Sequence, residues 1–75
     1  MTVRAYGMLA EITGSAALNY FEMNSIDELK SKLFSEYPEL AEKKFSIAVN
    51  RKIVTGNPAL NNSDDIALLP PFSGG

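Results

Sequence analysis

Apolar and polar residues alternate along the first part of the chain with the period of a β-strand. From Thr2 to Leu9 every second residue falls on the same side, which predicts a strand over this range. A second alternating stretch runs from Ala17 to Met23, and Gly14-Ser15 before it is a turn signal. The two stretches predict a hairpin over residues 2–23, whose loop spans roughly residues 10–14.

After Ser25 the period of the pattern becomes helical. Ser25 and Glu28 have the spacing of a capping box, in which the Ser25 hydroxyl accepts from the Glu28 amide and the carboxylate reaches back to the Ser25 amide. Apolar residues then recur at spacings of three and four until Pro38, which cannot continue a helix. This core-facing stripe comprises Ile26, Leu29, Leu33, Phe34 and Tyr37. The sequence therefore predicts one amphipathic helix over about Ile26 to Glu36.

Three further strands are predicted in the rest of the chain. The alternation of residues 45–49 gives a third strand, and residues 50–52 form a tight turn into a short return strand at Ile53-Val54. Residues 61–65 are a polar turn cluster, and Ile66 to Leu69 is the last strand.

The predicted element order is β-β-α-β-β-β, which makes this a two-layer α+β protein, since a single helix covers only one face of one sheet. The first and last strands carry apolar residues on both faces, which favours central positions where they would lie parallel. This arrangement is the β-grasp, the fold of ubiquitin: a mixed sheet of four to five strands with one main helix packed on one face. The predicted core joins the helix stripe to Phe45, Ile47, Ile66 and Leu68.

Composition excludes several classes of function. A chain of 75 residues predicts one domain, residues 1–75, with little room for an enclosed substrate cavity. It contains no Cys and no His, so no metal or cofactor site is expected, and thiolate nucleophiles and imidazole bases are excluded. The net charge of −2 argues against a nucleic-acid partner. Neither a signal peptide nor a membrane-spanning stretch is evident, so we expect a cytoplasmic protein.

The last six residues have the properties of an extended tail. Pro70 ends the strand and, with Pro71, stiffens the chain, while Ser73, Gly74 and Gly75 have almost no side-chain volume. Residues 70–75 reach at most about 20 Å when fully extended. Such a tail can carry its terminal carboxylate into a narrow channel of another protein, where a Cβ near the reacting carbonyl would clash.

The sequence resembles the MoaD family, the small subunit of molybdopterin synthase, and more broadly the MoaD and ThiS group of sulfur carriers. Residues 48–50 match the family's A-V-N, and residues 64–75 match its ending D-x-V-A-x-x-P-P-V-[ST]-G-G; residues 6–14 match F-x-x-x-R-E-x-x-G more loosely. The chain departs from the family pattern at Ala10, where Arg is common, at Ser63, where Gly is usual, and at Phe72, where Val is common. Without that Gly, Asn62 or Ser63 is expected to take the left-handed conformation.

The resemblance implies a mechanism centred on Gly75. A ubiquitin-activating-like adenylyltransferase, using ATP and magnesium, would adenylate the Gly75 carboxylate, and a sulfur donor protein would convert it to a thiocarboxylate. The large synthase subunit would receive the tail, Pro70, Pro71, Phe72, Ser73 and Gly74 included, and pass the sulfur to cyclic pyranopterin monophosphate to form the molybdopterin dithiolene. Two small and two large subunits are expected in the complex. The chain itself would be a non-catalytic subunit, with the active site on the large subunit.

The resemblance also implies a partner-binding patch formed by Tyr6, Ile53 and Leu69, beside the root of the tail. The simpler alternative is that these are ordinary residues on the second face of the sheet. Other functions also stay open: a sulfur carrier for thiamine thiazole or another thiolated product, a ubiquitin-like modifier of lysines, or a plain interaction domain. A direct enzyme is disfavoured, because Asp64-Asp65 is better explained as part of a turn.

Overall fold

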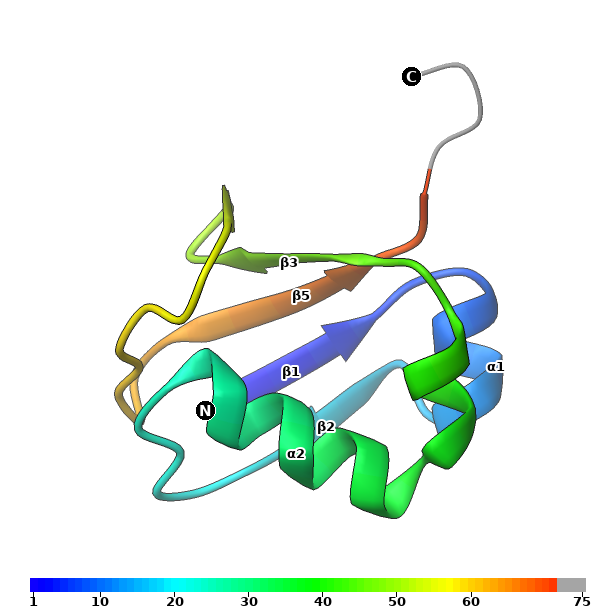
Figure 1. Cartoon of the computed structure of the whole chain (residues 1–75), viewed down its shortest axis with the longest axis horizontal. Coiled ribbons are helices and arrows are strands. Elements are labelled where there is room, and N and C mark those ends of the chain that lie inside the picture. The colour runs from blue at the N-terminus through cyan, green and yellow to red at the C-terminus, as the bar shows by residue number, and fades with distance from the viewer. Residues whose placement is uncertain (72–75) are drawn as a thin grey trace.

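A mixed five-stranded sheet forms the larger layer of the protein, and one main helix lies across one of its faces (Figure 1). The computed structural model describes residues 1–71. The elements, in chain order, are β1 (Thr2–Ala5), α1 (Met8–Thr13), β2 (Ala17–Asn19), α2 (Ile26–Glu36), the 3₁₀-helix η1 (Pro38–Glu42), β3 (Ser46–Val49), β4 (Lys52–Val54) and β5 (Asp65–Leu69).

The first and last strands lie side by side in the middle of the sheet. The strand order is β2-β1-β5-β3-β4, and β1 pairs with β5 in parallel, so that Val3 lies opposite Ile66. All other pairings are antiparallel. The predicted β-grasp fold is therefore confirmed, with two strands from opposite ends of the chain at its centre.

Helix α2 has the bounds that the sequence predicts. The Ser25 side chain accepts from the Glu28 amide at 3.3 Å, as in the predicted capping box. The return bond differs, since the Glu28 carboxylate accepts from the amide of Asn24, at 2.7 Å, and not from that of Ser25. The shift by one residue still satisfies an amide next to the helix start, which is what a capping box requires.

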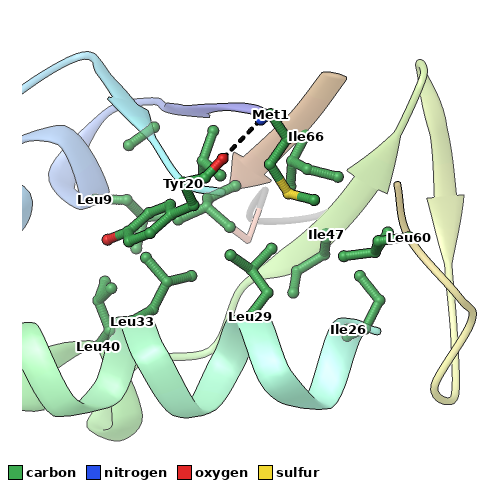
Figure 2. Packing of buried hydrophobic residues seen from close by; sticks show 13 residues of the cluster. Met1, Leu9, Tyr20, Ile26, Leu29, Leu33, Leu40, Ile47, Leu60 and Ile66 are labelled. Atoms are coloured by element: carbon green, nitrogen blue, oxygen red, sulfur yellow. Dashed lines mark hydrogen bonds between the residues drawn. The ribbon is translucent and has the colours of Figure 1, made fainter. Parts of the chain in front are cut away.

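The core lies between α2 and the sheet (Figure 2). Leu29 and Leu33 of α2 and Ile66 and Leu68 of β5 are fully buried, as predicted. Phe45 is only partly buried, and it lies just before β3, which begins at Ser46. Its ring and that of Phe34 pack edge to face, with ring centroids 6.3 Å apart.

The predicted strand from Thr2 to Leu9 is wrong in its second half. β1 ends at Ala5, and Gly7 turns the chain with φ 59° and ψ −133°, a conformation that a side chain would oppose. The helix α1 follows, where the sequence analysis predicts a loop. Leu9 and Thr13, four residues apart, are both buried, which is a helical spacing that the alternation of residues 2–9 had masked.

The second predicted strand is also too long. β2 ends at Asn19, and Tyr20 turns into the core, where its amide donates to the carbonyl of Met1. Glu22 then takes a φ of 61°, which breaks the extended backbone. Phe21 is left 72% exposed.

The turn at residues 61–65 forms without a left-handed residue, contrary to the expectation for Asn62 or Ser63. The Asp64 amide donates to the carbonyl of Asn61 at 3.1 Å, and the Asn61 side chain accepts from the Ser63 amide at 3.0 Å. Because the Asn61 side chain replaces a backbone acceptor, the chain reverses with ordinary dihedral angles.

Within residues 1–71, no helix combines the length and the hydropathy needed to cross a membrane. The same residues bring no three Asp and Glu side chains together in the way a metal ion would require.

Candidate functional site: the groove at the root of the tail

The parallel pairing of β1 and β5 brings the ends of these two strands to the same edge of the sheet (Figure 1). Tyr6 and Gly7 follow β1, and Pro70 follows β5. A Cβ built on Gly7 would lie 3.4 Å from Cγ of Pro70, so the two segments are in close contact. The tail predicted for residues 70–75 therefore starts beside the turn that follows β1.

The face of the sheet opposite α2 is formed by the residues of each strand that do not point into the core. In β5, Ile66 and Leu68 face the core, which leaves Ala67 and Leu69 on the open face. Ala67 lies opposite Ala48 of β3, and Ala48 lies opposite Ile53 of β4. Residues opposite one another share a face, so two alanines and one isoleucine form a row across three strands.

An open groove of about 640 Å³ lies on this face, at the edge where the tail begins. We call it the tail-root groove. It is lined by Tyr6, Gly7, Ala48, Arg51, Ile53, Ala67, Leu69 and Pro70. The small alanines leave the middle of the face low, and the larger side chains stand around them. Tyr6 is 46% exposed and Ile53 is 65% exposed, so apolar surface is open to solvent here.

The structure thus brings Tyr6, Ile53 and Leu69 to one groove, although they come from three different parts of the chain. Their role in binding a partner stays a prediction. The sequence analysis missed Gly7, Ala48, Arg51 and Ala67. The alternation of apolar residues could have shown that Ala48 and Ala67 face away from the core. Gly7 and Arg51 carry no such signal, and only the pairing of the strands brings them beside the two alanines.

Only the first two residues of the tail are among the described residues. Pro70 is half-buried against the groove and Pro71 is exposed. Phe72, Ser73, Gly74 and Gly75 lie outside the described residues, so the assignment of Gly75 as the reactive end stays a prediction.

The groove offers contact surface and lacks an acid–base pair. Of the part of the chain that the structure describes, the titratable side chains lining the groove are those of Tyr6 and Arg51, and no carboxylate lines it. On the same face, Arg4 and Asp65 neutralise each other, with Nε of Arg4 3.3 Å from Oδ1 of Asp65. Such a surface is suited to binding another protein.

The β-grasp fold and the apolar groove beside the start of a Pro-Pro…Gly-Gly ending define a ubiquitin-like protein of the carrier type. The ThiS family matches residues 3–75, and the chain belongs to that family. It is a ubiquitin-like sulfur carrier of the ThiS and MoaD group.

Solved structures with the same fold come from proteins with different names. The small archaeal modifier protein 1 of Methanosarcina acetivorans is 22% identical, with 99% of this chain and 94% of that one covered and a TM-score of 0.82. A putative molybdopterin converting factor subunit 1 of Pyrococcus furiosus is 17% identical over 95% of both chains, with a TM-score of 0.81. A chain from the complex of subunits 1 and 2 of the molybdopterin-converting factor of Helicobacter pylori 26695 is similar at 27% identity, with 99% of this chain and 96% of that one covered and a TM-score of 0.71.

Proposed function

We propose that this chain is the sulfur-donating small subunit of a molybdopterin synthase. The observation that carries the proposal is the tail-root groove, which places exposed apolar side chains beside the start of the Pro70-to-Gly75 segment. A protein whose tail must enter a partner's channel needs a surface at the tail root that holds the partner in place. The Helicobacter pylori structure, a complex of subunits 1 and 2 of the molybdopterin-converting factor, supports a large subunit as that partner.

The chemistry of the proposal takes place on the Gly75 carboxylate. A carboxylate resists nucleophilic attack because of its negative charge, so an activating enzyme first joins it to AMP, releasing pyrophosphate from ATP. A sulfur nucleophile at the oxidation level of sulfide then attacks the acyl carbon, and AMP leaves. The product is a thiocarboxylate, in which one oxygen of Gly75 has been replaced by sulfur.

The groove and the tail have separate tasks in this proposal. The groove would dock on the large subunit, while the tail would bring the thiocarboxylate to cyclic pyranopterin monophosphate bound there. Two transfers would complete the dithiolene, with two small and two large subunits in the complex. The ATP, magnesium and pterin sites belong to the partners. Because activation consumes ATP, we place the chain in the cytoplasm.

Intact-mass spectrometry tests the assignment of Gly75. After incubation with the activating enzyme, ATP and a sulfur source, the chain should gain the mass of one oxygen-to-sulfur exchange. The variant lacking Gly75 should stay unchanged, because it ends one residue short of the activating site. An equal mass gain in that variant would show that the sulfur is carried elsewhere.

A ubiquitin-like modifier is the second candidate, because the Methanosarcina modifier protein superposes on this chain as well as the Pyrococcus converting factor subunit does. Both functions begin with adenylation of Gly75 and diverge at the acceptor. The thiocarboxylated chain should convert the pyranopterin precursor to molybdopterin when mixed with the large subunit. Isopeptide-linked lysine conjugates without molybdopterin formation would instead favour the modifier. A carrier for thiamine thiazole would gain sulfur at Gly75, but it would form neither molybdopterin nor lysine conjugates.

A further inference from the structure

The turn between β3 and β4 has a backbone that its sequence does not favour. Asn50 and Arg51 both have positive φ values, 51° and 72°, and connect the paired residues Val49 and Lys52. This is the geometry of a two-residue hairpin turn with both central residues left-handed, for which Asn-Gly is the preferred sequence. Arg51 therefore stands where glycine is favoured, and its side chain makes the turn less stable than a glycine would.

Asn50 has an evident structural role in this turn. Its side chain accepts from the Asp65 amide at 3.0 Å and donates to the Asp64 carboxylate at 3.0 Å. Its own amide donates to the carbonyl of Asp65. These bonds tie the turn to the start of β5, and asparagine tolerates the left-handed conformation.

Arg51 makes no comparable contribution within residues 1–71. The ion pairs of this part of the chain are Arg4–Asp65 and Lys32–Glu36, so Arg51 is in neither. The two acidic residues that the neighbouring Asn50 contacts have other charged or polar partners, since Asp64 accepts from Asn50 and Asp65 pairs with Arg4. Arg51 is exposed, and it lines the tail-root groove.

Charge distinguishes this groove from two of the other hollows. The chain has a net charge of −2, and those two hollows combine carboxylates with a lysine: Glu11 and Glu39 with Lys43 in one, and Glu22, Asp27 and Glu28 with Lys32 in the other. Among residues 1–71, the one charged side chain that lines the tail-root groove is that of Arg51, a cation. An apolar groove with a single guanidinium at its edge is complementary to an apolar segment that carries a carboxylate.

The geometry points to Arg51 as the residue that selects the partner: the tail-root groove binds an apolar segment of the partner protein, and the Arg51 guanidinium pairs with an Asp or Glu side chain on that segment. This inference rests on the proposed function, since the partner is the large synthase subunit. The positive φ of Arg51 supports a role for this residue in binding, because backbone strain tends to gather at functional sites.

Lys52 provides a matched control. It is the next residue in the chain, it is exposed and it carries the same charge. It lies opposite Val49, which packs against the core, so its side chain belongs to the face away from the groove. Replacing Lys52 or Arg51 by Ala changes the net charge equally, and only Arg51 removes a cation from the groove.

The binding experiment is calorimetric titration of the purified large subunit with wild-type chain, Arg51→Gly, Arg51→Ala and Lys52→Ala, each at low and high NaCl. Arg51→Gly and Arg51→Ala should bind about tenfold more weakly at low salt. Lys52→Ala should bind like the wild type. Raising the salt should weaken the wild type and Lys52→Ala more than the two Arg51 variants, because salt screens the guanidinium–carboxylate pair.

A stability measurement tests the strain independently of any partner. Arg51→Gly should melt about 4 °C above Arg51→Ala, since glycine alone escapes the left-handed penalty. We expect the Arg51→Gly variant to be more stable than the wild type and, at the same time, to bind the large subunit more weakly. Equal melting temperatures for Arg51→Gly and Arg51→Ala would remove the strain argument and overturn the inference.

The two proposals fail in different ways. If the wild-type chain binds the large subunit and Arg51→Ala binds it as tightly as Lys52→Ala does, the role of Arg51 is overturned while the proposed function stands. If the wild-type chain does not bind the large subunit at all, the proposed function is overturned, and the inference about that partner with it.

Discussion

At the scale of single residues, backbone conformation limits which residue types can occupy positions in the tail-root groove. Gly7 turns the chain after β1 with φ 59° and ψ −133°, a region that is nearly closed to residues with a side chain. It also lies against Pro70, at the start of the tail. The two requirements, an unusual backbone and a close approach, meet at a single residue that the sequence analysis placed inside a strand.

We expect Gly7→Ala to lower the free energy of unfolding by about 2–3 kcal/mol, because it forces a strained conformation and adds a methyl group 3.4 Å from Pro70. Gly14→Ala is the matched control. Gly14 has φ 75° and ψ 9°, in the milder left-handed region, and nothing lies within 4 Å of an added Cβ. Its cost should be about 1 kcal/mol. Urea denaturation measures both, and equal losses would show that the turn after β1 is not the more constrained.

At the scale of elements, one hydrogen bond ties the end of β2 to the end of α2. The Tyr20 hydroxyl donates to Oε1 of Glu36 at 2.6 Å, and Nζ of Lys32 lies 3.5 Å from Oε2. The hydrogen bond from Tyr20 is the main reason that the pKa of Glu36 is lowered, with Lys32 adding to it. The pKa of Tyr20 is raised, mainly because its hydroxyl is partly buried and to a lesser extent because it lies beside the Glu36 carboxylate.

The sign of these pKa shifts predicts an acid-sensitive contact. A carboxyl group whose pKa is lower in the folded state stabilises the fold above its unfolded pKa of about 4.5, and this contribution is lost as the pH falls through the folded value. The stability difference between wild type and Tyr20→Phe should therefore be present at pH 7 and shrink as the pH falls below about 4.5. Thermal denaturation over a pH series measures it.

Glu36→Gln serves as the control for that series, because it removes the titrating group and keeps a hydrogen-bond acceptor. In the Glu36→Gln background, the effect of Tyr20→Phe should not change between pH 7 and acid. A Tyr20→Phe effect that varies with pH to the same extent in both backgrounds would mean that another group titrates.

At the scale of the whole molecule, the two ends of the sheet have different tasks. At the end away from the tail, asparagine side chains hold the loops: Asn62 accepts from the Glu22 amide and Asn57 from the Asp27 amide. At the other end, exposed apolar side chains surround the start of the tail. In a molecule only 31 × 25 × 18 Å in extent, the groove includes Pro70, where the tail begins, so one partner can contact both the groove and the start of the tail.

Leu69→Asp should weaken binding to both the large subunit and the activating enzyme while leaving the fold intact. Leu69 is half-buried on the open face, and apolar contacts near the centre of an interface outweigh charges at its rim. Calorimetric titration measures the affinities, with circular dichroism as the test of folding. Ile53→Asp should act in the same way, and it is the safer variant for folding because Ile53 is 65% exposed.

Lys43→Glu and Lys44→Glu are the controls for that titration, since both lysines are exposed and neither lines the groove. They should change the affinities little. Wild-type affinity in a folded Ile53→Asp or Leu69→Asp variant would mean that the tail alone holds the complex.

The sequence by itself was sufficient for the features that depend on local periodicity. It predicted the bounds of α2 and the burial of Ile26, Leu29 and Leu33, the central positions of β1 and β5, and hence the β-grasp fold. A capping box, a proline stop and a run of alternating residues act on neighbours in the chain, so their effect can be read without the fold.

Only the tertiary structure decided the remainder. The sequence analysis extended β1 through Leu9, because an alternating pattern does not reveal that Gly7 ends it and that α1 begins. It placed Tyr6, Ile53 and Leu69 in one patch by resemblance, yet it missed Ala48 and Arg51. These residues meet because β1, β5, β3 and β4 pair in a particular register, and register is set by packing among segments distant in the chain.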